Sequence, residues 1–255
     1  MHRAVYVGAV WVLLAVGTPA PAGEREAALA IIDRAIAAQG GEQALVKAQT
    51  VLRRGTGNMF VFDKPVPFTD ETLFHLPGQF RLTVTLGPDN QKTLVLVVVN
   101  GAKGWRSTGG AVVELSKDAV DEFREAGYLY WVGSLVPLKK DTNFQLSLLP
   151  EIKVQDQPAV GVKVAHKDHE SARLYFDKGT GMLVQMGHNI HEAGLQVDKD
   201  FILSDYKAFD GVKLPTKQTE LTKGKSDQKS KKFIEVSFTS YQFPEKLDDS
   251  AFGKP

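Results

Sequence analysis

The sequence contains no cysteine among its 255 residues. Disulfide bonds, thiol nucleophiles, thiolate metal sites and a lipid-modified N-terminal cysteine are therefore excluded. An excess of one charge is also missing, because 31 lysines and arginines stand against 30 aspartates and glutamates. This balance, without any basic stripe, gives no support for nucleic-acid binding, and no motif predicts a cofactor.

Long apolar runs are missing from all but the first residues. Ala4–Val16 is apolar, follows a short basic start and precedes Ala20-Pro21-Ala22. This order is typical of a secretory signal peptide, which we expect to be cleaved after Ala22. The run falls short of the ~20 residues of a membrane span, although a retained N-terminal anchor is the alternative interpretation. The length of residues 23–255 suits one large β-rich domain. Because the chain is expected to be exported and has no cysteine, we expect it in a bacterial periplasm.

Two segments predict helices. In Glu24–Gln39, apolar residues recur at helical spacing and Gly40-Gly41 follows, as is common past a helix end. A second helix is predicted over Lys117–Ala126, ended by Gly127. The aromatic segment Tyr128–Leu138 comes next, and we expect this helix-and-loop insertion to cover the concave face of a sheet.

The most apolar segment of the mature chain predicts a central hairpin. Thr93–Val99 is apolar at nearly every position, and successive side chains of a strand point to opposite faces. Both faces of this strand must therefore be covered. Asn100-Gly101 favours a tight turn, which places Trp105 on the returning strand.

The remaining segments predict an antiparallel sheet. More than ten short runs alternate with turn residues and no long helix separates them, so consecutive strands should pair. Pro65 and Pro67 predict a turn, and Phe144–Leu149 and Ile152–Val154 predict two separate strands. So many strands in one sheet favour curling. The expected fold class is α+β, a curved, half-open antiparallel β-barrel with helices on its concave face.

Five motifs in this order resemble a known family. They are Ala-Gln-Gly-Gly (38–41), Asn-Gly-x-x-Gly-Trp (100–105), Tyr-Phe-Asp-x-x-Thr-Gly (175–181), Asp-Gly-Val-Lys-Leu-Pro (210–215) and Phe-Gly-Lys-Pro (252–255). The chain resembles the LolA/LolB-like superfamily of periplasmic outer-membrane lipoprotein-sorting proteins. The resemblance implies roughly eleven strands around an apolar cavity for acyl chains. It also implies an arginine in that cavity on an early strand, where Arg53 and Arg54 stand here.

Catalytic and metal motifs are weak. Gly133-Ser134 lacks the second glycine of a nucleophile elbow, and Lys223-Gly224-Lys225-Ser226 lacks the first glycine of a phosphate loop. His166 and His169 are three residues apart, as are His188 and His191, with Glu192 adjacent. On strands this spacing points two side chains to opposite faces, so no metal site and no catalytic residue is predicted. A hydrolase or metal enzyme built on these histidines remains the third hypothesis.

The first hypothesis is a carrier that binds a hydrophobic ligand, such as an acyl chain of a lipid or lipoprotein. The second is an envelope sensor or protein-interaction module of the same fold without a lipid, with an envelope protein as its partner. The candidate cavity-lining residues are Phe80, Leu82, Val84, Leu94, Leu96, Trp105, Leu129 and Trp131.

Overall fold

The computed structural model describes residues 22–192, 195–224, 229–248 and 250–255. In this part of the chain four helices accompany thirteen strands. The helices are α1 (Ala22–Ala38), α2 (Glu42–Lys47), α3 (Lys117–Gly133) and α4 (Pro137–Lys140). The strands are β1 (Thr50–Val61), β2 (Lys64–His75), β3 (Gln79–Leu86), β4 (Thr93–Asn100), β5 (Lys103–Thr108), β6 (Ala111–Glu114), β7 (Gln145–Val154), β8 (Gln157–His166), β9 (His169–Asp177), β10 (Leu183–Glu192), β11 (Leu195–Phe209), β12 (Val212–Gly224) and β13 (Lys231–Gln242). Except for Ala22, the first residue of α1, the expected signal peptide lies outside these ranges.

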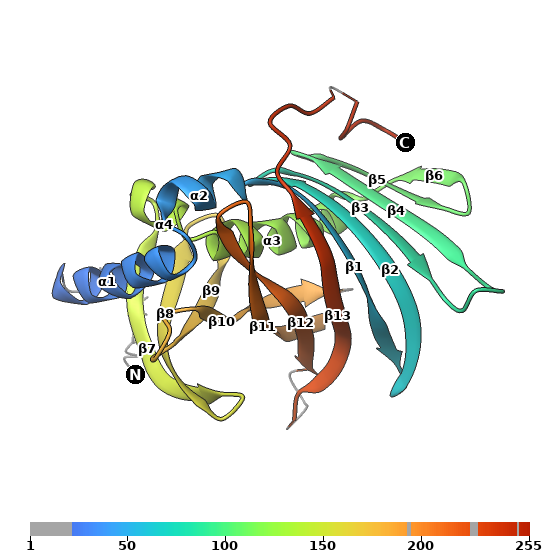
Figure 1. Ribbon diagram of the computed structural model, residues 1–255. Coiled ribbons are helices and arrows are strands. Elements are labelled where there is room, and N and C mark those ends of the chain that lie inside the picture. Colours follow the sequence, from blue (N-terminus) through green and yellow to red (C-terminus); the bar gives the residue numbers. More distant parts are fainter. Residues whose placement is uncertain (1–21, 193–194, 225–228, 249) are drawn as a thin grey trace, which may run out of the picture.

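All thirteen strands form one sheet, in the order β6-β5-β4-β3-β2-β1-β13-β12-β11-β10-β9-β8-β7. Apart from β6 and β7, strands next to each other in sequence also pair antiparallel in space, and the pair of β1 with β13 joins the two halves. The sheet curves strongly (Figure 1). It does not close into a barrel, because β6 and β7 are its two edges. The α+β class and the half-open antiparallel sheet are confirmed, whereas the expected count of roughly eleven strands is wrong.

Two local strand predictions are wrong as well. Apart from Phe144, which precedes the strand, Phe144–Leu149 and Ile152–Val154 belong to the single strand β7, which has an irregularity of register between Leu149 and Ile152. Pro65 and Pro67 lie inside β2 rather than in a turn. The carbonyl of Pro67 accepts a hydrogen bond from the backbone N–H of Gly87, just past the end of β3. Pairing of β2 with β3 starts only at Phe68. The proline nitrogens therefore face a stretch where β3 supplies no acceptor, which is where a strand tolerates proline.

The helix α1 covers one end of the sheet as its apolar spacing predicts. Ala28, Ile32 and Ala35 are fully buried in the largest hydrophobic core. The Nη1 atom of Arg25 donates to the carbonyl of Phe144, and a Glu24 carboxylate oxygen accepts from the backbone of Leu148, which anchors the helix against the edge strand β7.

The helix α3 runs along the inside of the curved sheet (Figure 1), as expected for the insertion. The predicted end of this helix at Gly127 is wrong, because the helix continues to Gly133. Gly127 is buried, and a Cβ there would meet its nearest neighbour outside the helix, the carbonyl of Pro77, at 3.6 Å. Packing on the sheet thus outweighs the low helix propensity of glycine. Among the described residues, no helix has the length and apolar composition that crossing a bilayer requires.

Candidate functional site

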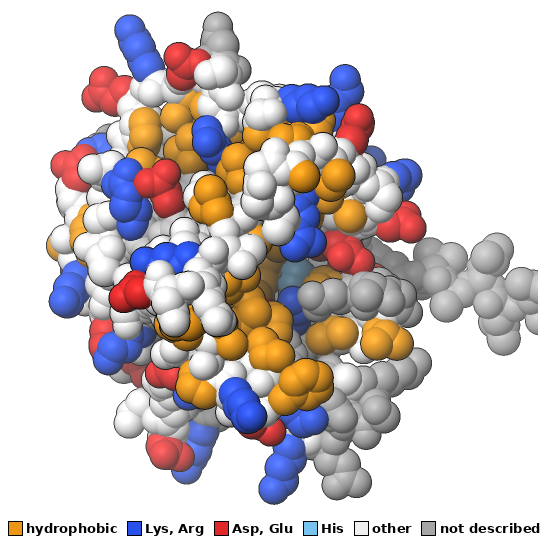
Figure 2. Space-filling model, turned by 90° about the vertical axis from the view of Figure 1, so that its right-hand side faces the viewer, with side chains coloured by type: hydrophobic (Ala, Val, Ile, Leu, Met, Phe, Trp, Pro, Cys, Tyr) orange, Lys and Arg blue, Asp and Glu red, His pale blue; other side chains and the backbone are white. Residues whose placement is uncertain are grey.

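A hollow lies on the concave side of the sheet, between α3 and strands from both halves of the molecule. It has a volume of about 280 Å³ and mostly apolar walls. The face shown in Figure 2 is hollowed near its centre, and hydrophobic side chains gather there with lysines and arginines at the margin. We call this space the wide hollow. It is lined by Arg53, Thr72, Phe74, Phe80, Leu82, Glu122, Phe123, Ala126, Gly127, Tyr130, His188, Ile190, Lys199, Phe201 and Glu220.

A smaller cavity of about 100 Å³ lies deeper, toward α2. We call it the inner cavity, and its walls include Leu45, Val51 and Met186. Arg53, Phe74 and Tyr130 line both spaces. These three side chains therefore stand between them, and the rings of Phe74 and Tyr130 pack with centroids 4.9 Å apart.

Three of the expected lining residues share the face that meets α3. Phe80 and Leu82 line the wide hollow. Val84 pairs with Val95 and lies further along the same face, in a cluster with Phe68 and Val236. The sequence could not show which face of the sheet meets α3, because β4 is apolar on both sides.

Leu94, Leu96 and Trp105 lie on the other face. Leu94 and Leu96 pair with Thr85 and Thr83 of β3, and Trp105 pairs with Val98. Residues that pair directly project to the same side of a sheet, so these three side chains point away from α3. Leu94 is 53% exposed, and none of the three lines either space.

The two expected residues of α3 lie beside the hollow rather than in it. Leu129 is 1% exposed within the main core, and Trp131 packs on Phe144 with ring centroids 5.2 Å apart. Tyr130, which lies between them in sequence, is the residue of this segment that lines both spaces. The sequence held a signal for it: Phe123, Ala126, Gly127 and Tyr130 fall at i, i+3, i+4 and i+7, which is one stripe of a helix that continues through Gly127.

Arg53 is the most enclosed cation of the site. Its guanidinium lies 3.8 Å from the Asp70 carboxylate, and the two side chains are 12% and 6% exposed. The guanidinium carbon also lies 4.1 Å from the ring centroid of Phe238, so the charge is further held by aromatic faces. Burial opposes this charge, but Tyr130, Asp70 and Tyr241 outweigh burial and raise the pKa of Arg53.

The neighbouring Arg54 lies on the opposite face. It pairs with Glu71 at 2.7 Å, and both side chains are more than 40% exposed. Of the two arginines that the family resemblance singled out, only Arg53 therefore enters the hollow.

A second ion pair lies across the hollow. The Lys199 ammonium is 3.1 Å from a carboxylate oxygen of Glu220, with side chains 13% and 8% exposed. His188 pairs with Lys199 in the sheet and is 1% exposed. Burial lowers the pKa of His188 to about 4, with help from the positive charges of Lys199 and Arg173. His188 is therefore neutral near pH 7.

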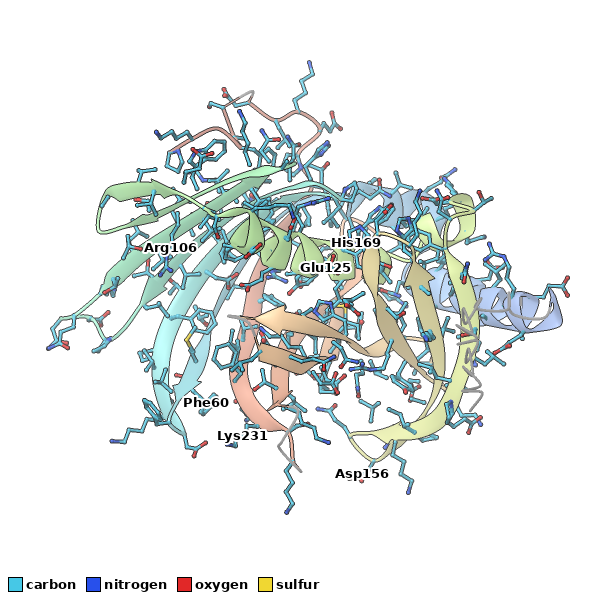
Figure 3. All side chains as sticks on the ribbon, turned by 180° about the vertical axis from the view of Figure 1, so that it is seen from behind. Phe60, Arg106, Glu125, Asp156, His169 and Lys231 are labelled. Carbon is cyan, nitrogen blue, oxygen red and sulfur yellow. The ribbon has the colours of Figure 1, made fainter. Side chains whose placement is uncertain are left out.

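The other histidines make structural contacts. The Nδ1 atom of His169 lies 2.7 Å from a carboxylate oxygen of Glu125, and the two side chains point toward one another in Figure 3. The ring of His169 also stacks on Tyr128 at 3.9 Å, and His166 lies 5.4 Å from it between ring centroids. Within the described residues, no group of three or more His, Asp or Glu side chains is arranged for a metal ion. The side chains of His191 and Glu192 lie outside the described part.

The weak catalytic motifs are accounted for in part. The hydroxyl of Ser134 donates to the carbonyl of Trp131 at the end of α3, a helix-terminal contact. Lys223 and Gly224 end β12, and residues 225 and 226 of the second motif lie outside the described residues.

Known structures share this architecture. A LolA superfamily protein from Nitrosomonas europaea aligns with a TM-score of 0.54 and 12% identity over 89% of this chain and 97% of its own. A putative outer-membrane lipoprotein-sorting protein domain from Vibrio parahaemolyticus gives 0.52 and 12% over 90% and 97%. A DUF1329 family protein from Desulfovibrio piger gives 0.55 and 12% over 88% and 96%. No protein-family profile matches the sequence, and no curated protein matches it either. The resemblance to LolA-like proteins is thus confirmed at the level of the fold.

Proposed function

We propose that this chain, which has the LolA-like fold, is a periplasmic carrier that binds a hydrophobic ligand in the wide hollow. The observation that carries the proposal is the apolar space between α3 and the sheet, which shares a wall with the inner cavity. Ligand sites typically measure about 300–1,000 Å³, and the wide hollow, at about 280 Å³, comes close to the lower end of this range.

The ligand that fits these walls is an acyl chain of a lipid or lipoprotein. Each buried methylene contributes about 0.8 kcal/mol, so a segment of eight methylenes contributes on the order of 6 kcal/mol before the losses of ordering. Phe80, Leu82 and Phe123 supply apolar walls on either side of such a chain.

Arg53 supplies a polar contact at the inner end of the wide hollow. Its Nε atom is buried and has no hydrogen-bond partner among the described residues. A neutral carbonyl oxygen, such as that of an acyl ester, would satisfy this donor without displacing Asp70 from the guanidinium. The resemblance to lipoprotein carriers, which place an arginine in their cavity, supports the same role.

Ligand uptake tests the proposal directly. The protein, expressed as the full chain and purified from the periplasm, should show added ligand mass by native mass spectrometry and should bind a fluorescent fatty acid. The mass should also show cleavage after Ala22. Ala126→Phe places a large ring on the hollow-facing side of α3 and should lower the affinity at least tenfold. Ala30→Phe, an exposed alanine of α1, is the matched control and should bind normally. An empty protein that takes up no fatty acid would contradict the carrier function.

The alternative is an envelope sensor or interaction module that uses the same fold without a lipid. Affinity capture from an envelope fraction separates the two functions. One stoichiometric protein partner together with an empty hollow would favour the module, whereas bound lipid without such a partner favours the carrier.

A further inference from the structure

The hairpin between β1 and β2 carries a phenylalanine in an unfavourable position. Phe62 is 95% exposed and has a φ of 49°, and Asp63 follows with a φ of 62°. Val61 and Lys64 pair on either side, so the turn has two residues with positive φ. Such turns prefer asparagine and glycine, and a bulky aromatic residue there is strained. Both the backbone and the exposed ring of Phe62 therefore oppose the fold, which indicates a role outside it.

Apolar and basic side chains surround this phenylalanine. Val61 is 42% exposed, and Lys64 is also exposed at the start of β2. Strand β13 lies beside β1, and its first residues are Lys231 and Lys232. The Lys232 ammonium lies 5.4 Å from the ring centroid of Phe60.

Lys231 and Phe60 lie at the same lower edge of the sheet in Figure 3. We call Val61, Phe62, Lys64, Lys231 and Lys232 the β1–β2 tip. Among the described residues, the acidic groups beside these lysines are Asp63 in the turn and Glu235, which pairs with Lys232 at 2.9 Å. Three lysines against these two carboxylates leave the tip positive.

We propose that the β1–β2 tip docks on an anionic phospholipid surface. Phe62 enters the headgroup layer, as aromatic side chains do at membrane interfaces, and the lysines lie against lipid phosphates. The shape of the tip favours lipid over a protein partner. A stable protein interface buries about 800 Å² on each side, whereas two exposed apolar side chains on a narrow turn offer far less.

The tip is connected to the wide hollow by the concave face of the sheet. Phe68, Val236 and Phe238 form a cluster there, with Met59 and Ile234 packed against it. Phe238 in turn lies against Arg53. A docked tip would thus place a continuous apolar stripe between the bilayer and the hollow. Docking is nevertheless independent of the proposed function, because the two use different residues.

Vesicle binding without added ligand tests the docking. Protein purified from cells that express the full chain should sediment with vesicles of equal parts phosphatidylglycerol and phosphatidylcholine, and only weakly with phosphatidylcholine alone. Phe62→Asn should lower binding about tenfold, from the loss of buried ring area. It should leave the melting temperature unchanged or raise it, because asparagine tolerates positive φ. The double variant Lys64→Gln with Lys231→Gln removes two positive charges and should lower vesicle binding about fivefold for each lysine.

Matched controls lie far from the tip. Val113→Asn replaces another exposed apolar residue, on β6, and the pair Lys103→Gln and Lys246→Gln removes two exposed lysines elsewhere. Both controls should bind vesicles normally. In Phe62→Trp, the added tryptophan emission should shift to the blue on vesicles.

Three results would overturn the proposal. They are absent vesicle binding, equal binding to neutral vesicles, and binding that Phe62→Asn leaves intact. If vesicle binding is absent and the wild type captures an envelope protein that Phe62→Asn does not capture, the tip would be assigned to a protein partner. Fatty-acid uptake measured without vesicles reports on the hollow alone, so failure of docking and failure of the carrier function are distinguishable.

Discussion

The ion pair of Arg53 and Asp70 should decide much of the stability of the candidate site. We consider Asp70→Ala, which removes the carboxylate 3.8 Å from the guanidinium. At an effective dielectric constant of about 20, two unit charges at this distance attract by about 4 kcal/mol. The side chains are only 12% and 6% exposed, so solvent screens them little. Removing one partner of a buried pair costs about 3–5 kcal/mol, because the other charge stays buried and unpaired.

Urea unfolding followed by the fluorescence of Trp105 and Trp131 measures this loss. Asp70→Ala should lower the free energy of unfolding by about 3–5 kcal/mol. Part of the loss comes from Thr72, whose hydroxyl donates to Asp70 at 3.1 Å. The double variant Arg53→Met with Asp70→Leu should be more stable than Asp70→Ala, because it buries no unpaired charge.

The adjacent pair on the opposite face is the control. Arg54 and Glu71 are closer, at 2.7 Å, but both side chains are more than 40% exposed. Distance alone would rank this pair as the stronger one, whereas burial ranks it as the weaker. Glu71→Ala should therefore lower stability by less than about 1 kcal/mol. Equal losses for Asp70→Ala and Glu71→Ala would refute the argument from burial.

Two further predictions concern α3 and the hollow. Gly127→Ala should stabilise the protein by about 0.5–1 kcal/mol, because alanine favours the helix and the new Cβ makes only ordinary contacts at 3.6 and 4.0 Å. Urea unfolding should show a higher midpoint, and a loss of stability would contradict this reasoning. His188 has a pKa lowered to about 4 in the folded state, against about 6.5 when unfolded. The unfolded chain therefore binds the extra proton first on acidification, and stability present above pH 6.5 should fall by up to about 3 kcal/mol toward pH 4. His188→Leu should flatten this slope in urea titrations, and an unchanged slope would show that His188 does not cause it.

The sequence was informative where its periodicity had one interpretation. The apolar spacing of α1 identified the side that is buried, and Asn100-Gly101 marked the turn between β4 and β5, where Gly101 has a φ of 60°. The strand β4 was different, because apolar residues on both faces give no sign of which side is concave. The structure resolves it through register: the face with Val97 and Val99 meets Val120 of α3.

The candidate site was predicted least well where one residue changed the interpretation of a segment. Ending α3 at Gly127 separated Phe123 from Tyr130 and concealed the stripe that lines the hollow. Arg53 and Arg54 could not be told apart for a related reason. Alternation along β1 puts them on opposite faces, but the bulge between Arg54 and Gly55 and the long-range pairing of β1 with β13 are not visible in local sequence.

The charges of the hollow narrow the chemistry of the proposed ligand. Arg53 stands against Asp70, and Lys199 against Glu220, so these two buried ion pairs balance, while Glu122, the other carboxylate of the lining, is only half-buried. A ligand with its own net charge inside the hollow would have to displace one of these partners and leave it buried, at a cost of several kcal/mol. An acyl chain requires no such exchange, and its polar head would remain toward the solvent. The paired ions therefore favour ligands that are neutral in their buried part. A charged amphiphile should bind only as far as its chain enters, so affinity should rise with chain length and change little with the charge of the head group.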